Sequence, residues 1–338
     1  MEILLFAFNA VLPILTLIGV GYLLKRVGFL TEEFLRVGNK FVFRIALPAL
    51  LFYTIYSISS FTIINWSVII YSVIAILILF IFGLIIANLF IPDKKQKGVI
   101  IQAIFRSNFA IIGIPLAQAL GGVEAIAIVA LVSAIAVPLM NILAVIALSL
   151  YIKEDDAKLE MKETLIQVIK NPLIIGVLLG LFTLFIRSLI PIDSTTMLPV
   201  FTIEHNLTFL YTAIKWLGQI ASPFALIVLG GTFEFFVIKS LGKQIVIGTL
   251  SRVVFAPLIT LSLAVILSLK TSFFNFSSLD YPAFIALLAS PTAVSSAIMA
   301  KEMQNDEKLA VQLVVWSTMS SIISIFIIVV IFRAFDLL

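Results

Sequence analysis

The segment 98–119 places polar side chains and a proline inside otherwise apolar sequence. Its centre reads Arg106-Ser107-Asn108, and Pro115 follows after Gly113. Proline lacks a backbone donor and clashes with the carbonyl four residues earlier, so Pro115 should break a helix here. The Asn108 amide offers donors and an acceptor, so it can bind a carboxylate. We expect Ser107, Asn108 and Pro115 to contribute to a ligand-binding site.

The segment 281–301 repeats this combination with Ser290-Pro291-Thr292 near its middle. Two interrupted apolar helices in corresponding positions indicate the binding site of a transporter. Half-helix N-termini can hold a carboxylate, and freed carbonyls can hold a cation. The alternative interpretation is two plain kinks, with Asn108 serving only as a hydrogen-bonded link between helices.

Charged side chains within apolar sequence are further candidates. Arg106 and Arg252 lie inside apolar segments, and Glu234 lies near the end of the segment that precedes Arg252. Such charges are costly in lipid and face a cavity or a partner. Arg252 could pair with Glu234, or either arginine could contact an anionic substrate or serve coupling. Because no Asp or Glu lies at the centre of an apolar segment, an anionic substrate is favoured over a carboxylate proton relay.

The composition indicates the environment in which these residues work. Hydrophobic residues make up 62% of the chain and charged residues 12%, against about 45–50% and about 25% in soluble domains. Long apolar runs predict an all-α integral membrane protein. The net charge of +4 then reflects basic loops rather than nucleic-acid binding. With no cysteine and one histidine, His205, we expect no metal site and no cofactor.

Ten apolar segments are long enough to span a bilayer, for which about 20 residues are needed. They cover residues 3–24, 37–56, 66–91, 98–119, 123–152, 171–190, 213–237, 243–268, 281–301 and 307–335. Five precede and five follow a charged stretch. The predicted organisation is a first five-helix repeat at 1–152, a cytoplasmic linker at 153–170 and a second repeat at 171–338.

The odd number of spans per half predicts that the two halves insert with opposite orientation. Pro48 matches Pro223, and Pro115 matches Pro291, at similar offsets in corresponding spans. Connections after odd-numbered spans carry 15 Lys and Arg residues, whereas the opposite face carries 4. The positive-inside rule therefore predicts a multi-pass plasma-membrane protein with both termini outside the cytoplasm.

Several short motifs resemble the auxin efflux carrier family, whose bacterial members are often called malate permeases. They are Gly19-Val20-Gly21-Tyr22, Asn39-Lys40-Phe41-Val42-Phe43, Leu47-Pro48-Ala49-Leu50, Phe105-Arg106-Ser107-Asn108-Phe109, Gly113-Ile114-Pro115-Leu116 and Ser290-Pro291-Thr292-Ala293. The resemblance implies ten helices in two inverted repeats, with broken helices 4 and 9 crossing, as in bile-acid symporters and sodium–proton antiporters. It also implies a scaffold of helices 1, 2, 6 and 7 and a transport domain of helices 3–5 and 8–10.

The resemblance implies residue roles as well. The family's substrate-contacting asparagine corresponds to Asn108, and its crossover prolines correspond to Pro115 and Pro291. We therefore expect a secondary transporter of a small organic anion, a mono- or dicarboxylate such as malate or an auxin-like acid. It would work by alternating access, and an elevator-type movement of the transport domain is one form that this could take. Coupling to Na⁺ or H⁺, ion-independent uniport and a homodimer stay open.

Two other classes of function compete with transport. A membrane sensor would bind the same ligand without moving it. An intramembrane enzyme would need a buried acid, base or nucleophile set, which His205 and the acidic residues of the sequence do not form. We therefore expect that the protein is not an enzyme.

Overall fold

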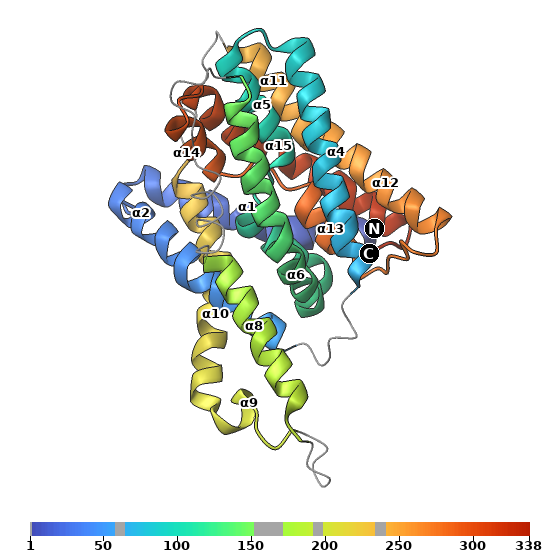
Figure 1. The fold of residues 1–338 in the computed structure, drawn as a ribbon. Coiled ribbons are helices and arrows are strands. Elements are labelled where there is room, and N and C mark those ends of the chain that lie inside the picture. The colour runs from blue at the N-terminus through green and yellow to red at the C-terminus, as the bar shows by residue number, and fades with distance from the viewer. Residues whose placement is uncertain (1, 58–64, 152–171, 192–198, 234–240) are drawn as a thin grey trace.

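The computed structural model describes residues 2–57, 65–151, 172–191, 199–233 and 241–338 (Figure 1). In these ranges the regular elements are helices. Six helical stretches are long and apolar enough to cross a membrane: α1 (Glu2–Arg26), α4 (Trp66–Phe90), Phe109–Ser149, α10 (Thr208–Gly231), Gly242–Lys270 and α15 (Glu307–Ala334). The prediction of an all-helical, multi-pass membrane protein is therefore confirmed.

Further helical elements lie within these long stretches or between them. They are α2 (Glu32–Phe41), η1 (Val42–Ala46), α3 (Leu47–Tyr56), α5 (Lys94–Phe105), η3 (Phe109–Gly113), α6 (Ile114–Ser149), α8 (Pro172–Leu189), α9 (Ile203–Asn206), α11 (Gly242–Leu250), η5 (Ser251–Phe255), α12 (Ala256–Lys270), α13 (Tyr281–Leu288) and α14 (Ser295–Glu302). The elements η1, η3 and η5 are single π-helical turns.

Each π turn is followed by a proline at the second position of the next α-helix. These prolines are Pro48, Pro115 and Pro257. A proline removes one backbone donor and crowds the carbonyl four residues before it. Widening the preceding turn to the π form accommodates the ring while the helix continues. Proline at these three positions therefore widens a helix without interrupting it.

A glycine divides α6 into two helical segments. Gly122 has φ 65° and ψ −151°, a backbone conformation that side chains with a Cβ rarely adopt. The kink falls at the boundary expected between the segments 98–119 and 123–152.

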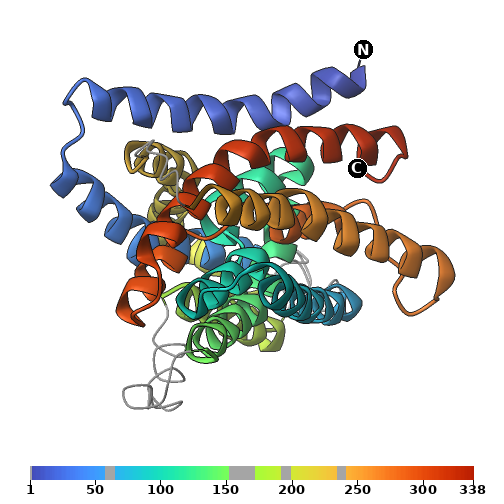
Figure 2. The same cartoon turned by 90° about the horizontal axis from the view of Figure 1, so that it is seen from above.

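The packing contacts divide the helices into two groups. In Figure 1, α8 and α10 extend away from α4 and α12, and in Figure 2 α1 (blue) runs beside α15 (red). Helix α3 packs on α8 and α10, and α10 packs on α1, so these four helices form one group. In the other group α5 packs on α4 and α6, α13 packs on α6, and α15 packs on α11 and α14. Contacts of α1 with α15, and of α6 with α3 and α8, join the two groups.

Side-chain hydrogen bonds tie helix ends together at one end of the second group. Gln96 Nε2 donates to Asp306 Oδ2 at 3.0 Å, and Gln244 Nε2 donates to Gln96 Oε1 at 3.0 Å. Asn305 Nδ2 donates to the Leu148 carbonyl at 3.1 Å. These bonds bring together the starts of α5 and α11, the end of α6 and the α14–α15 connection.

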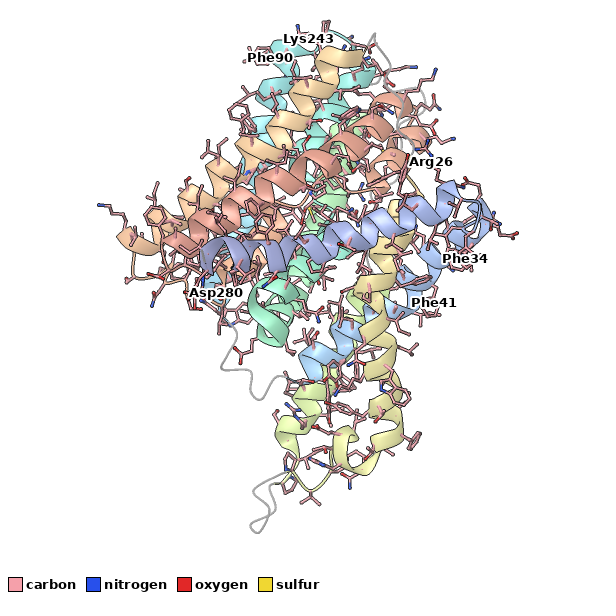
Figure 3. The ribbon with its side chains drawn as sticks, turned by 180° about the vertical axis from the view of Figure 1, so that it is seen from behind. Arg26, Phe34, Phe41, Phe90, Lys243 and Asp280 are labelled. Atoms are coloured by element: carbon pink, nitrogen blue, oxygen red, sulfur yellow. The ribbon has the colours of Figure 1, made fainter. Side chains whose placement is uncertain are left out.

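Another set of contacts marks a different end, where Asp280 lies far from Lys243 and Phe90 (Figure 3). Asn65 precedes α4 and Asp280 precedes α13, and Asn65 Nδ2 donates to Asp280 Oδ2 at 3.3 Å. The Arg333 guanidinium carbon lies 4.8 Å from the centroid of the Phe6 ring, so the end of α15 lies beside the start of α1.

Glycines allow α1 and α10 to approach closely, and this contact predicts a difference between two substitutions. A Cβ added to Gly21 would lie 2.0 Å from the Ile227 carbonyl oxygen, whereas one added to Gly19 would have no heavy atom within 4 Å. Gly21→Ala should lower the free energy of unfolding by about 1–3 kcal/mol, because α10 must move away.

The matched control, Gly19→Ala, should be neutral or slightly stabilising, because alanine favours helix. Thermal unfolding of both variants in detergent measures the difference. Equal stability of the two variants would contradict this close packing of α1 on α10.

Candidate ligand-binding site at the helix crossing

Two helices are interrupted at the same place in the molecule, and their extended residues pair with each other. Helix α5 ends at Phe105 and α13 ends at Leu288. The Asn108 N–H donates to the Pro291 carbonyl at 2.7 Å, and the Ala293 N–H donates to the Arg106 carbonyl at 3.0 Å. Ser107 and Thr292 thereby form an antiparallel bridge, and the crossing pairs main-chain groups that both helices left open.

Two hydroxyl side chains complete the crossing. Thr292 Oγ1 donates to the Ala103 carbonyl at 3.0 Å, and Ser317 Oγ, on α15, accepts from the Thr292 N–H at 3.1 Å. An unpaired backbone group in an apolar interior costs several kcal/mol. The side chains of Thr292 and Ser317 therefore maintain the interrupted backbone.

The position expected for the first break was wrong. The interruption covers Arg106–Asn108, while Pro115 lies at the second position of α6, after the π turn η3. Pro291 pairs with Asn108 across the crossing and not with Pro115. The physical reason is that a π turn accommodates a proline, whereas an extended segment needs backbone partners from a second segment.

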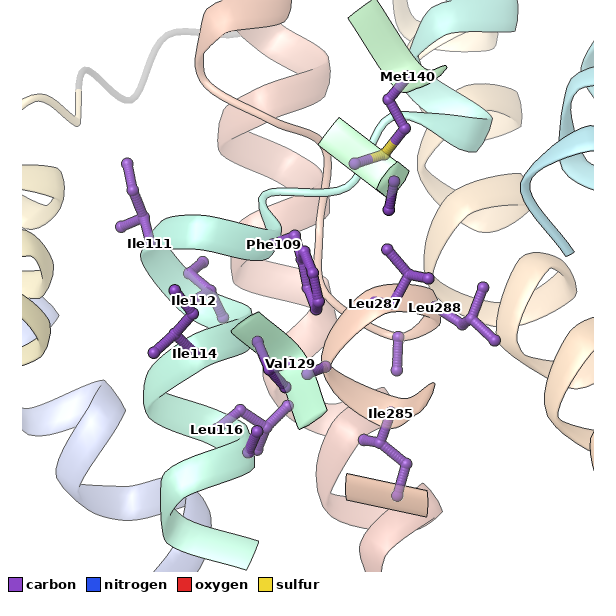
Figure 4. Packing of buried hydrophobic residues seen from close by; sticks show 14 of the residues in the cluster. Phe109, Ile111, Ile112, Ile114, Leu116, Val129, Met140, Ile285, Leu287 and Leu288 are labelled. Atoms are coloured by element: carbon purple, nitrogen blue, oxygen red, sulfur yellow. The ribbon is translucent and has the colours of Figure 1, made fainter. Parts of the chain in front are cut away.

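Gly113 has a packing role instead. A Cβ there would lie 2.8 Å from the Ala286 carbonyl oxygen, so the absent side chain lets η3 lie directly against α13. Apolar side chains of η3, α6 and α13 surround this contact, among them Phe109, Leu287 and Val129 (Figure 4).

A cavity of about 190 Å³ opens beside the crossing. Its lining residues are Phe43, Arg106, Ser107, Asn108, Phe109, Ala110, Val137, Met140, Asn141, Leu173, Ala293 and Ser295. Sites for drug-sized ligands have about 300–1,000 Å³, so this volume suits a small molecule. Of the expected site residues, the cavity brings together Arg106, Ser107 and Asn108. The other five in the described chain, Pro115, Arg252, Ser290, Pro291 and Thr292, are not among its lining residues.

Two side chains of the cavity have unused hydrogen-bonding capacity. Asn108 Nδ2 and Ser107 Oγ are buried, and within the described part of the chain they have no hydrogen-bond partner. Buried polar atoms are rarely left unpaired in proteins. Both atoms belong to residues that line the cavity and have capacity for a further hydrogen bond.

The guanidinium of Arg106 gives the cavity a positive charge. Its Nη2 donates to Asn141 Oδ1 on α6 at 2.7 Å, and its Nη1 contacts Met299 Sδ on α14. None of the described residues of the lining is acidic, so no carboxylate among them offsets this charge. Asn141 was missed in the sequence, although an amide inside the apolar segment 123–152 is the signal that could have identified it.

Arg252 lies elsewhere in the crossing. It is fully buried in η5, and its guanidinium donates to the carbonyls of Ile104, Leu287 and Ser290. Glu234, its expected partner, lies outside the described residues.

Comparison of the sequence with known proteins gives two findings. The profile of the membrane transport protein family matches residues 6–329, nearly the whole chain. A search of curated proteins found no match.

The bond between Ser317 and Thr292 predicts a stability difference between two serines of α15. Ser317→Ala should lower the free energy of unfolding by about 1–3 kcal/mol, because the buried Thr292 N–H loses its acceptor. Ser321 is also buried, but its hydroxyl donates to the Thr318 carbonyl within the same helix. Ser321→Ala should therefore change stability less, and thermal unfolding in detergent compares the pair. A larger loss in Ser321→Ala would contradict the role assigned to Ser317.

Proposed function

We propose that this chain, which belongs to the membrane transport protein family of the auxin efflux carriers, is a secondary transporter of a small organic anion. The observation that carries the proposal is the positively charged cavity beside the crossing, with Arg106, Asn108 and Ser107 in its lining. Family membership also argues against an enzyme, since the family is one of transporters.

The lining suggests how such an anion would bind. A carboxylate can accept hydrogen bonds from the Arg106 guanidinium, Asn108 Nδ2 and Ser107 Oγ together, and charge-assisted bonds of this kind are the strong ones. Phe43 and Val137 offer apolar contact to the remainder of the molecule. The proposed substrate class is a mono- or dicarboxylate such as malate or an auxin-like acid.

The helix groups support an alternating-access mechanism. We assign α1, α2–η1–α3, α8 and α10 to a scaffold and the other long helices to a transport domain, because each group packs within itself. The cavity takes Phe43 and Leu173 from the first group and its polar residues from the second. A substrate there would lie between the two domains and could cross the membrane with an elevator-type movement.

The contacts at the helix ends support ten crossings in two inverted five-helix halves. The kink at Gly122 allows the segments before and after it to count as separate spans. The starts of α5 and α11 lie together with the α14–α15 connection, and this end carries Lys94, Lys95 and Lys243. By the positive-inside rule we assign this end to the cytoplasm and both termini to the outside.

The direct test is uptake of labelled monocarboxylates and dicarboxylates into proteoliposomes, with Na⁺ and pH gradients imposed separately. Uptake above that of protein-free liposomes is expected for at least one class. Binding without flux for each anion tested would replace the proposal with a ligand sensor, and absence of both would reject an organic anion as the ligand.

Asn108→Ala should reduce uptake or raise KM at least about tenfold, equivalent to about 1.4 kcal/mol, because the carboxylate loses a donor. Asn88→Ala is the matched control, since Asn88 is exposed at the end of α4 and accepts from Lys97 and Tyr151. Uptake by the control should equal that of the wild type. Wild-type kinetics in a folded Asn108→Ala protein would remove Asn108 from the site.

The contact between Arg106 and Asn141 provides a charge test. Asn141→Asp should lower anion affinity by tenfold or more, because a carboxylate next to the guanidinium neutralises it at short range. Asn141→Gln, which keeps a neutral amide, should lower affinity less. Binding measured by calorimetry or ligand-induced stabilisation compares the variants, and unchanged affinity in Asn141→Asp would show that Arg106 does not attract the anion.

A further inference from the structure

We propose that Arg252 is a resident cation that occupies, at the crossing of the two interrupted helices, the position a metal cation would otherwise take. Transport would then proceed without Na⁺ or K⁺ bound at the crossing. Only the statement about ion-independent transport rests on the proposed function. The role of the guanidinium at the crossing is tested without substrate.

The contacts of Arg252 reach both interrupted helices. Nη1 donates to the Ile104 carbonyl at 2.8 Å, next to the end of α5. Nη2 donates to the Leu287 carbonyl at 3.2 Å, next to the end of α13, and Nε donates to the Ser290 carbonyl at 2.8 Å. A second bond links Nη2 to Ser290 O. One side chain therefore collects main-chain oxygens from the ends of two helices and from the break itself.

The charges at this point balance. The C-terminal end of a helix carries up to about half a negative elementary charge. Two such ends, from α5 and α13, together present up to about one negative charge to one guanidinium. Arg252 is 0% exposed, so water does not screen this attraction. A group of convergent carbonyl oxygens is also the arrangement that binds alkali cations in channel filters.

A metal cation would compete with Arg252 for the same ligands. The guanidinium already uses the carbonyls of Ile104, Leu287 and Ser290, and a second positive charge beside it would be repelled. Among the described residues, the hydrogen-bond partners of the Arg252 guanidinium are main-chain oxygens, and none is a carboxylate. A guanidinium bound in this way neutralises helix ends rather than an acidic side chain.

The two buried arginines therefore have different tasks. Arg106 lines the cavity and contacts side chains of α6 and α14. Arg252 does not line the cavity, and within the described chain its guanidinium donates to main-chain oxygens. Arg106 is placed to meet an anion, and Arg252 is a positioning residue that holds the crossing on which Ser107 and Asn108 are carried.

Chemical rescue tests the proposal in detergent without substrate. Arg252→Ala should lower Tm, and millimolar guanidinium should raise the Tm of this variant saturably while leaving the wild type unchanged. Leu261→Ala is the matched control, because it removes a buried side chain from the neighbouring helix α12 without exposing a carbonyl cluster. Guanidinium should not rescue the control. Equal responses of the two variants would overturn the proposal.

Two further measurements of Tm test the proposal even if Arg252→Ala does not fold. Arg252→Lys should fold with a Tm between wild type and Arg252→Gln, because it keeps the charge and loses the planar fork. A Tm for Arg252→Lys no higher than for Arg252→Gln would contradict a cationic role. In the wild type, Tm should be the same in NaCl, KCl and choline chloride, and a saturable rise specific to Na⁺ or K⁺ would overturn the proposal.

The uptake assay separates this inference from the proposed function. Wild-type uptake of an accepted anion should have the same rate in Na⁺ and in choline, and a requirement for Na⁺ would count against Arg252 as the replacement. If no organic anion is taken up but guanidinium rescues Arg252→Ala, the proposed function fails and the resident cation stands. The reverse result, uptake that requires Na⁺, keeps the transporter and removes the resident cation.

Discussion

The need to pair main-chain polar groups inside an apolar protein governs this structure. Interrupting α5 and α13 exposes N–H and C=O groups where water cannot satisfy them. The two breaks bond to each other through Asn108 with Pro291 and through Ala293 with Arg106. Hydroxyl groups and one guanidinium pair several of the groups that remain. The crossing is thus held by bonds between segments far apart in sequence.

This pairing leaves ligand binding to side chains. The bridge between Ser107 and Thr292 uses backbone donors that a half-helix start could have offered to an anion. Arg106, Ser107 and Asn108 line the cavity, and Asn108 Nδ2 and Ser107 Oγ have no hydrogen-bond partner in the described chain. No acidic residue stands beside Arg106 among the described lining residues. The backbone fixes where these groups stand, and in the proposed function these side chains would bind the anion.

Glycine and proline determine how closely the surrounding helices approach and where they bend. Gly21 allows α1 to touch the backbone of α10, and Gly113 allows η3 to touch α13. Pro48, Pro115 and Pro257 follow widened turns and do not interrupt their helices. Proline in a membrane helix is therefore a weaker sign of a break than a polar segment that can pair with a second one.

Composition and apolar run length determined by themselves that the chain is a helical membrane protein. In lipid, a long apolar segment pairs its backbone N–H and C=O groups by forming a helix. Local polarity also identified Arg106, Ser107 and Asn108, since charges and amides in such sequence need a cavity or a partner. Tertiary structure alone decided that Asn108 faces Pro291, that Asn141 holds Arg106 and that Arg252 binds carbonyls of two helices. Each of these bonds joins residues at least 35 positions apart, and no periodicity or local motif specifies such a partner.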